Sequence, residues 1–361
     1  MSEKATFFVP GPTWVRREIM EQMLRPMIGH RSAEFRDLFR SITPRLQSLF
    51  RTEQLAFFAA CSGTGLMEGA LLNTVSRAVL GTTCGAFSER WVSIAHKLGL
   101  EADQLETEWG EPVDPIKVAD HLQGRRHHHY DAVTITHNET STGVINDVAE
   151  IAKAIRSVSE DTLILVDAVS SLAAAPLLMD EWGIDVCFAS CQKGLAMPPG
   201  LTVFAVSERA MAQADSKHYK GTYFNFREFR RHADEGGVPF TPAIPQVYAL
   251  ERQLRAILEE EGLENRWKRH RLMRERTLER TAGYADPASN TAALSPSVTA
   301  LMPERITSAD LLAAMRARGY TLGGGYGKWK ENTFRIGHMG DIALDDLDGM
   351  LDVLEDVAGG E

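Results

Sequence analysis

The chain has 361 residues, of which 44% are hydrophobic and 24% charged, as in ordinary folded globular proteins, and it is long enough for two domains. Its 39 Lys and Arg against 49 Asp and Glu give a net charge of −10, which argues against a nucleic-acid partner because phosphate binding needs a basic face. No apolar run reaches the ~18 residues that span a bilayer and the start shows no signal-peptide pattern, so we expect a cytoplasmic protein with no membrane partner.

The first apolar run, residues 7–13, is extended and is broken by a Pro-Gly-Pro turn. Thr13 is expected to cap a helix that runs to about Met23. We expect residues 1–15 to form an arm that lies across a domain or subunit boundary.

A second helix is expected from Ser32 to about residue 50. His30 and Arg31 come just ahead of it, and an arginine beside a histidine at a helix start is a candidate anion site.

A strand over residues 55–60 then leads through a small, glycine-rich turn into a helix over residues 66–75. This arrangement presents free backbone N–H groups to a phosphate, to which Ser62 and Thr64 can add hydroxyl donors around Gly63. A plain strand-to-helix turn with a serine or threonine cap is the alternative.

Two further strand ends carry candidate ligand residues. Phe87 follows the strand near Val79 and can stack on a flat heterocycle, although core packing would also explain it. Thr140 lies in the polar loop after the strand of residues 131–137, where open α/β sheets bind ligands. A helix over residues 147–158 follows.

The central observation is a lysine on an irregular turn between two buried strands. Lys193, next to Gln192, follows the strand of residues 185–189 and precedes that of residues 201–206, where a long cation gains nothing from packing. A solvated lysine on a surface turn is the ordinary explanation. Asp167, which ends the apolar strand before, favours a pyridoxal phosphate site, since that cofactor needs a lysine for its aldehyde and an acid for its pyridine nitrogen.

Strands separated by helices in this way predict an α/β fold with a mostly parallel sheet. We assign it to a large domain of residues 16–261 and expect a smaller α+β domain over residues 262–361. Within the first, residues 217–237 are interpreted as a long irregular aromatic loop. Thr241 is expected to cap the next helix, which would run to Glu260.

In the smaller domain, Arg335 lies inside a half-buried strand and therefore needs an anionic partner. A carboxylate of the protein is one possibility, and a substrate carboxylate held by the bidentate guanidinium is the other.

The remaining charged and thiol-bearing groups are assigned no site. The basic stretch of residues 266–280 is interleaved with glutamates and is interpreted as the solvated face of a helix, and the three histidines of residues 127–129 as an exposed loop. No metal site is expected. The cysteines lack metal spacing and are interpreted as free thiols of a reducing cytoplasm: Cys61, Cys84, Cys187 and Cys191.

These motifs resemble the class V aminotransferases of fold type I, within which the alanine–glyoxylate and serine–glyoxylate (serine–pyruvate) group is the most similar. The residues that carry the resemblance are Val166-Asp167, residues 179–185, 190–193 and 198–200, and it extends from residues 10–12 to residues 334–337. It implies a fold type I transferase with a seven-stranded type of sheet, pyridoxal phosphate as cofactor and a homodimer with shared active sites.

The resemblance also implies residue roles. Lys193 would hold the cofactor as a Schiff base and act as the catalytic acid and base, with Asp167 on the pyridine nitrogen, while Arg335 would bind the substrate's α-carboxylate. Thr241 would reach the neighbouring subunit's cofactor, although Val238 replaces a tyrosine common in that contact. The other cofactor-binding residues would be Ser62, Gly63, Thr64, Phe87, Thr140 and Gln192.

The implied reaction moves an amino group from alanine or serine to glyoxylate or pyruvate. Phosphoserine aminotransferase is the main alternative, because its family carries a similar motif whose counterparts of His30 and Arg31 would face a substrate phosphate. A class V lyase would need a cysteine after Cys191, which the chain lacks. A scaffold without catalysis is the third alternative.

Overall fold

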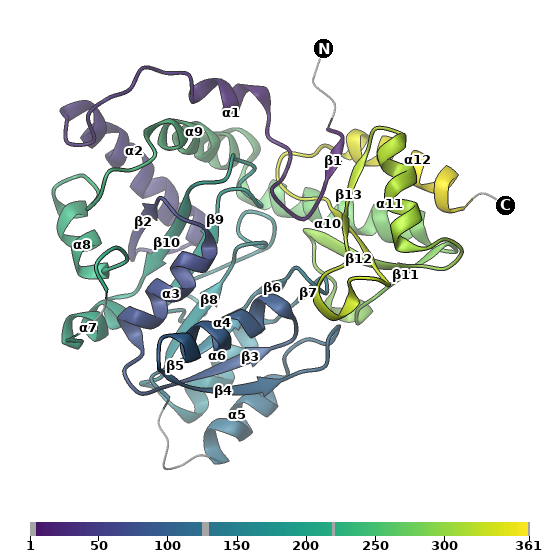
Figure 1. Ribbon diagram of the computed structural model, residues 1–361. Helices are drawn as coiled ribbons and strands as arrows, with labels where there is room; N and C mark the ends of the chain where they lie inside the picture. Colours follow the sequence, from purple (N-terminus) through teal and green to yellow (C-terminus); the bar gives the residue numbers. More distant parts are fainter. Residues whose placement is uncertain (1–4, 125–129, 219–220, 360–361) are drawn as a thin grey trace.

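The computed structural model describes residues 5–124, 130–218 and 221–359 (Figure 1). In this part of the chain, a seven-stranded sheet has all strands parallel except β10, which runs antiparallel to both of its neighbours. The predicted mostly parallel sheet is therefore confirmed. Its strands, in sheet order, are β2 (Leu55–Ala59), β10 (Thr202–Val206), β9 (Val186–Ser190), β8 (Leu163–Asp167), β5 (Ala132–Thr136), β3 (Ala78–Thr83) and β4 (Glu101–Glu106).

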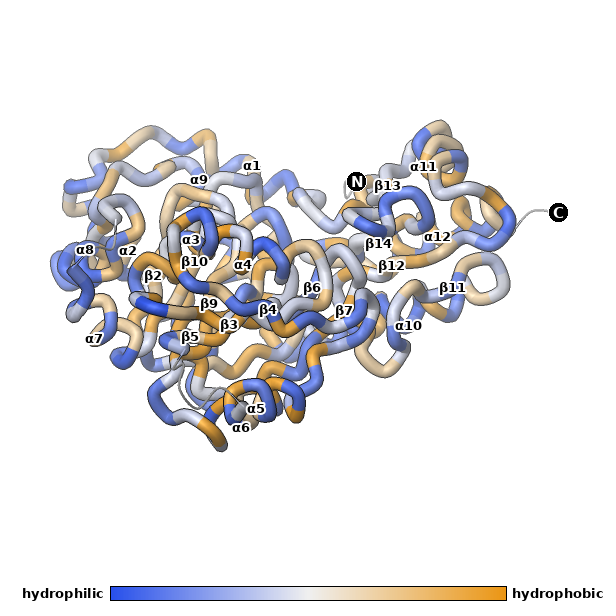
Figure 2. Tube along the Cα trace, turned by 60° about the horizontal axis from the view of Figure 1, so that its bottom comes forward, coloured by the Kyte–Doolittle hydropathy of each residue, from blue (hydrophilic) through white to orange (hydrophobic). Residues whose placement is uncertain are grey.

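Both faces of this sheet are buried, because alternate residues of each strand enter two separate cores. In β2, Phe58 belongs to one core and Phe57 to the other. Figure 2 shows these strands as largely hydrophobic segments beneath more polar helices. One face is covered by α2 (Ala33–Phe50), α5 (Pro115–Gly124), α6 (Val148–Val158) and α9 (Ile244–Arg255), and the other by α3 (Gly63–Thr74), α4 (Ala86–Lys97), α7 (Glu208–Ser216) and α8 (Phe226–Asp234).

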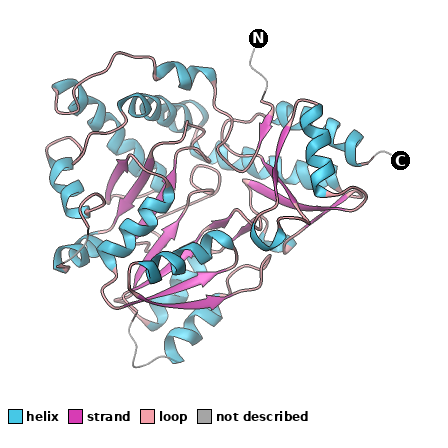
Figure 3. Ribbon diagram, in the orientation of Figure 1, coloured by secondary structure: helices cyan, strands magenta, loops and turns pink. Residues whose placement is uncertain are grey.

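A second, five-stranded sheet is formed by the C-terminal part of the described chain together with the N-terminal strand (Figure 3). Its order is β1 (Phe7–Phe8), β13 (Thr321–Gly324), β14 (Phe334–Gly337), β12 (Val298–Pro303) and β11 (Ala285–Pro287). It shares a core with α10 (Leu263–Thr281), α11 (Ser308–Ala317) and α12 (Leu344–Ala358). The short elements are α1 (Arg17–Gln22), β6 (Asn138–Glu139), β7 (Val144–Ile145), the π-helical η1 (Ala256–Glu261) and the 3₁₀ turns η2 (Thr291–Ala293) and η3 (Gly327–Trp329).

Two predicted helix caps are wrong. The N–H of Thr13 donates to the carbonyl of Gln192 at 3.0 Å, and helix α1 begins only at Arg17. Helix α9 begins at Ile244 with Ala243 as its N-cap, so Thr241 lies exposed in the preceding loop. In both places the chain runs on extended past the expected cap, because tertiary contacts override the local signal.

The aromatic segment is also more regular than predicted. Residues 226–234 form α8, capped by Asn225, whose side chain accepts from the N–H of Arg227. Phe226 and Phe229 are buried against Phe204 of the sheet. The histidine tract of residues 127–129 lies outside the described residues.

The basic stretch on α10 is only partly solvated, and for Arg266 the prediction is wrong. Its side chain is 1% exposed and donates to Glu261 at 2.7 Å, to Asp341 at 2.8 Å and to the carbonyl of Gly194 at 2.9 Å. Arg276 keeps the expected position, 44% exposed beside Asp348. A buried arginine thus joins α10 to the turn that carries Lys193.

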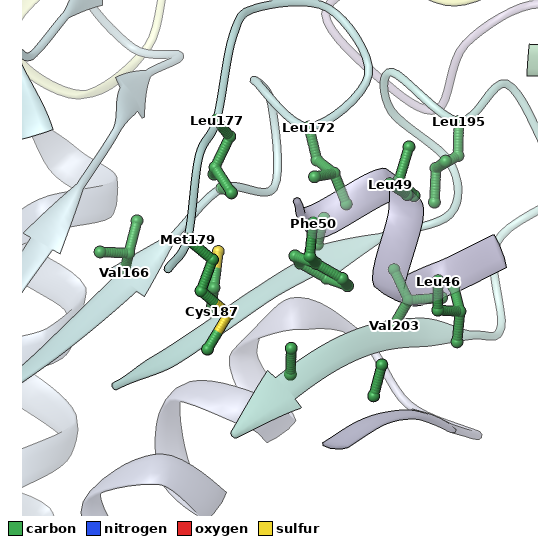
Figure 4. Close-up of a cluster of buried hydrophobic side chains, with 14 of the residues drawn as sticks. Leu46, Leu49, Phe50, Val166, Leu172, Leu177, Met179, Cys187, Leu195 and Val203 are labelled. Carbon is green, nitrogen blue, oxygen red and sulfur yellow. The ribbon is translucent and has the colours of Figure 1, made fainter. Parts of the chain in front are cut away.

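Apolar side chains fix the base of that same turn. Leu195, 1% exposed, belongs to the core cluster that contains Leu49 and Phe50 of α2 and Leu172 of the segment after β8 (Figure 4). At Gly194 a Cβ would lie 2.3 Å from the carbonyl oxygen of Leu172, so only glycine allows this close approach. The backbone on either side of Lys193 is therefore rigidly placed.

Candidate active site

A cavity opens at the carboxyl ends of the parallel strands, where an open α/β sheet places its ligands. Lys193 and Asp167 both line it. Its lining residues are Ser62, Gly63, Thr64, Met67, Phe87, Arg90, Asn138, Thr140, Asp167, Val169, Ser170, Ser190, Gln192 and Lys193. Seven residues predicted to bind a cofactor, along with Lys193, are thus brought together from distant parts of the chain.

Lys193 is enclosed rather than solvated. Its Nζ donates to the carbonyl of Pro10 at 2.5 Å, and a Cβ on Gly11 would come within 2.7 Å of the same nitrogen. Burial, reinforced by the positive charge of Arg335, lowers the pKa of Lys193 to about 8. An amine with this pKa is partly neutral near pH 7, as a nucleophile and a proton acceptor must be.

Asp167 is a carboxyl group without a cation beside it. It is 4% exposed at the end of β8, and its Oδ1 accepts from the N–H of Val169 at 2.8 Å. Burial, with a smaller contribution from Glu139, raises the pKa of Asp167 to about 7, although Arg90 and Lys193 oppose the shift. No ion pair of Asp167 forms within the described residues, so the group is suited to a ligand that brings its own positive charge.

The glycine-rich turn at the start of α3 is open to an anion. Ser62 is the N-cap residue of α3, yet its hydroxyl makes no capping hydrogen bond. The alternative of a plain turn with a serine cap is therefore not what the structure has. A Cβ on Gly63 would lie 2.7 Å from Val169 and 2.9 Å from Ser190, which requires glycine here. Arg90 donates to the hydroxyl of Thr64 at 3.1 Å and adds a positive charge at this turn.

Phe87 is held in place by a buried carboxylate. Glu139, 0% exposed, accepts from the N–H of Phe87 at 3.1 Å and from that of Ser88 at 2.9 Å, at the first turn of α4. The carboxylate therefore caps this helix and fixes the ring that lines the cavity. Sequence reasoning missed this role, because a cap supplied from 51 residues away leaves no local pattern.

Several polar atoms around the cavity have no partner. Both amide atoms of Asn138 and the Oε1 of Gln192 are buried without a hydrogen bond within the described part of the chain. Thr140 shares a hydrogen bond of 2.6 Å with Ser170. Because unpaired buried polar groups are costly, this set is suited to a polar ligand. Asn138 was not predicted, although its place two residues after β5 was the available signal.

Arg335 lies next to this cavity, 8% exposed on β14. Its Nε donates to the carbonyl of Gly324 at 2.8 Å and its Nη1 to that of Thr140 at 3.0 Å. Burial lowers the pKa of Arg335 to about 10. Among the described residues no carboxylate pairs with it and Nη2 makes no hydrogen bond, so the alternative of a structural ion pair does not hold.

Three of the predicted site residues lie elsewhere in this chain. Thr241 lines a shallow depression with Val238 and Tyr223. His30 is half-buried and Arg31 exposed ahead of α2, and neither lines the cavity of Lys193. Their assigned roles depend on a second subunit or on a substrate phosphate, and they stay predictions.

Comparison with known proteins settles the family. The family model described as aminotransferase class-V matches residues 51–326. The chain belongs to this family. The serine–glyoxylate aminotransferase of Methylorubrum extorquens is 35% identical over 98% of this chain and 89% of its own, and the L-aspartate–glyoxylate aminotransferase of Paracoccus denitrificans is 32% identical over 95% and 88%. The crystal structure of an alanine–glyoxylate aminotransferase from Nostoc sp. superposes with a TM-score of 0.91 at 26% identity, covering 99% of this chain and 96% of that one.

The protein is accordingly a pyridoxal phosphate-dependent aminotransferase, and the cavity fits that cofactor. The open helix start at Ser62 is suited to the phosphate, the unpaired amide of Asn138 to a polar ring substituent, and Asp167 to the charged ring nitrogen. Among the described residues, each helix is too short or too polar to cross a bilayer, and no cluster of three or more metal-ligating side chains occurs.

Proposed function

We propose that the enzyme transfers the amino group of a small amino acid, alanine or serine, to glyoxylate or pyruvate. The observation that carries this proposal is the guanidinium of Arg335, which lies close to Lys193 and has no carboxylate partner within the described residues. Every amino acid and 2-oxo acid has the α-carboxylate that this group would bind. The three relatives described above are named glyoxylate aminotransferases, which supports the choice of acceptor.

In this proposal the cofactor is held at both ends. Lys193 would hold its aldehyde carbon through Nζ as a Schiff base, and Ser62, Gly63 and Thr64 would hold the phosphate. Asp167 pairs with the pyridine nitrogen. The remaining contacts come from Phe87, Thr140 and Gln192, with Thr241 contributed across a subunit boundary.

When bound, pyridoxal phosphate supplies an aldehyde that takes up the amino group and a conjugated ring that withdraws electrons from the substrate's α-carbon. Arg335 orients the substrate through its carboxylate. Lys193, once its Nζ is released, removes the proton from the α-carbon, for which a pKa of about 8 is well placed. The negative charge of Asp167 keeps the ring nitrogen protonated throughout.

We further propose a homodimer in the cytoplasm. Large apolar side chains are exposed in the segment after α1, with Leu24 83% and Met27 67% exposed, which favours a surface that a partner covers. All four cysteines are free, as in a reducing compartment.

We also propose a division of the chain into an arm of residues 1–15, a large domain of residues 16–261 and a small domain of residues 262–361. Strand β1 of the arm pairs with β13 in the sheet of the small domain.

The direct test is a substrate panel on the purified holoenzyme. Alanine, serine, aspartate, glutamate and phosphoserine are each paired with glyoxylate, pyruvate and 2-oxoglutarate, and kcat/KM is measured for each pair. We expect alanine or serine with glyoxylate or pyruvate to be preferred. A preference for phosphoserine with 2-oxoglutarate that Arg31→Ala abolishes would instead establish the phosphoserine alternative.

A further inference from the structure

A tyrosine of the small domain forms a wall beside the substrate site. The ring of Tyr326 stacks on that of Phe87, with centroids 5.3 Å apart and planes 21° from parallel. On the same tyrosine, the guanidinium carbon of Arg335 lies 5.5 Å from the ring centroid. Tyr326 therefore bridges the residue that lines the cofactor cavity and the residue proposed to hold the substrate's carboxylate, and at 39% exposed it is accessible to a ligand.

The loop that carries Tyr326 is rigid. The N–H of Gly325 donates to the carbonyl of Thr333 at 2.9 Å, and the hydroxyl of Thr333 donates to the carbonyl of Trp329 at 2.9 Å. A Cβ on Gly325 would lie 2.3 Å from the carbonyl oxygen of Trp329, so the turn is packed too tightly for any side chain at this position. The tyrosine is thus fixed from the side of its own domain.

The large domain holds the same loop from the other side. Trp109 meets Trp329 edge to face at 5.9 Å, and a Cβ on Gly327 would come within 2.5 Å of the Trp109 ring. The indole N–H of Trp109 donates to Glu89 at 2.9 Å, and Glu89 belongs to α4, the helix that carries Phe87. Helix α4 and the loop of Tyr326 are therefore both in contact with Trp109, and this contact fixes the two stacked rings relative to each other.

A carboxylate bound to Arg335 must lie close to this wall. The hydrogen bonds of such a pair are about 2.8 Å long, and the substrate's side chain begins only two covalent bonds from the carboxylate carbon. With Arg335 this near the face of Tyr326, the first atoms of that side chain share the space beside the ring. A hydrogen, a methyl or a hydroxymethyl group needs little of this space, whereas a branched or aromatic side chain needs the volume that the ring occupies.

We infer that Tyr326 is the residue that restricts this enzyme to amino acids with small side chains. The inference rests on the proposed function, specifically on Arg335 as the α-carboxylate site. A wall that is already fixed before the substrate arrives rejects large side chains by steric overlap, because its position is held by Trp109 and by the closed turn around Gly325.

The test compares Tyr326→Ala, Tyr326→Leu and Tyr326→Phe in the holoenzyme. For each, kcat/KM is measured with alanine and serine and with leucine and phenylalanine as donors, at saturating glyoxylate. We expect Tyr326→Ala to raise the leucine-to-alanine ratio of kcat/KM by about tenfold or more, and Tyr326→Leu to raise it less. Tyr326→Phe keeps the ring and is the matched control, for which the ratio should stay within about twofold of the wild-type value.

The outcomes separate the two proposals. If the wild-type holoenzyme transaminates alanine or serine and the ratio is unchanged in Tyr326→Ala, the role of Tyr326 is wrong while the proposed function stands. If the wild type transaminates none of these donors, the proposed function itself fails. Thermal unfolding and the absorbance of the bound cofactor, measured on every variant, show that a changed ratio does not come from misfolding or from cofactor loss.

Discussion

At the scale of single residues, the chemistry depends on groups that the fold removes from water. Lys193 has a pKa of about 8 because it is buried near Arg335, and Asp167 has a pKa of about 7 because its burial outweighs the opposing charges of Arg90 and Lys193. Perturbed groups that face each other across one cavity are characteristic of active sites. Their properties can be tested one at a time.

Replacing the lysine should remove the covalent link to the cofactor and leave the fold intact. Lys193→Ala eliminates an amine whose one hydrogen bond within the described residues is to the Pro10 carbonyl, so the core is not disturbed. We expect unchanged far-ultraviolet circular dichroism, loss of the absorbance of covalently bound cofactor, and turnover reduced by several orders of magnitude. Normal turnover in this variant would show that another group binds the aldehyde.

Asp167 should make the cofactor-free protein less stable as the pH rises. The unfolded chain releases this proton near pH 3.8 and the folded chain near pH 7, so the folded state binds more protons in between and its free energy of unfolding falls across that window. Asp167→Asn lacks this decline. In urea unfolding of the cofactor-free protein, we expect the variant to exceed the wild type by on the order of 1–3 kcal/mol at pH 8 and to match it at pH 3.

The same substitution should reduce kcat of the loaded enzyme strongly, because the amide cannot keep the ring nitrogen charged. A variant whose unfolding free energy follows the wild-type pH dependence would contradict the assignment of the raised pKa to Asp167.

The sequence predicted the residues of the site better than their surroundings. Lys193, Asp167 and Arg335 are out of place in a strand end or a core, so they stand out in the sequence. Lys193 and Asp167 line one cavity and Arg335 lies next to it, while their roles stay predictions. Asn138 and Tyr326 do not stand out, because a loop asparagine and an exposed tyrosine are ordinary. Their importance is visible only in the fold, where the amide of Asn138 is buried without a hydrogen bond and Tyr326 stacks on Phe87.

At the scale of helices and strands, the local patterns were sufficient for the central strands and for α2 and α6. Strand β4 was missed because it is a polar edge strand, Glu101–Glu106, in which no residue is fully buried. Thr241 gave a false cap because a threonine before proline is a valid local signal that the loop here does not use. Local patterns identify elements that bury apolar faces and fail where tertiary contacts decide.

Helix α10 gives a sharp test of a buried ion pair against an exposed one. Arg266→Ala would leave Asp341, whose side chain is 4% exposed, without one of its arginine partners, and would release the Gly194 carbonyl. We expect a loss of about 3–5 kcal/mol in the free energy of unfolding, measured by urea denaturation at fixed protein concentration. Arg276→Ala, on the exposed face of the same helix, should change it by less than about 1 kcal/mol. Equal effects would mean that Arg266 is not energetically buried.

At the scale of the whole molecule, the exposed apolar residues after α1 predict the assembly. Leu24→Glu combined with Met27→Glu places two charges where we expect the partner subunit. Light scattering coupled to size exclusion should show a dimer for the wild type and a monomer for this variant, with activity lost along with the dimer. Ile116→Glu, at a 70% exposed apolar residue of α5, is the matched control and should remain dimeric. A wild-type monomer with full activity would refute the shared-site proposal.

The N-terminal strand also sets an order of events during synthesis. Phe7 and Phe8 pair with Thr321 and Leu322, while Pro10, just beyond them, supplies the carbonyl that receives the Lys193 amine. Phe7 and Phe8 can therefore pair only after more than 300 later residues have been synthesised. A nascent chain can complete the large sheet earlier. The surroundings of Lys193 are complete only when β1 has paired with β13. The active site is therefore completed late in the folding of each molecule.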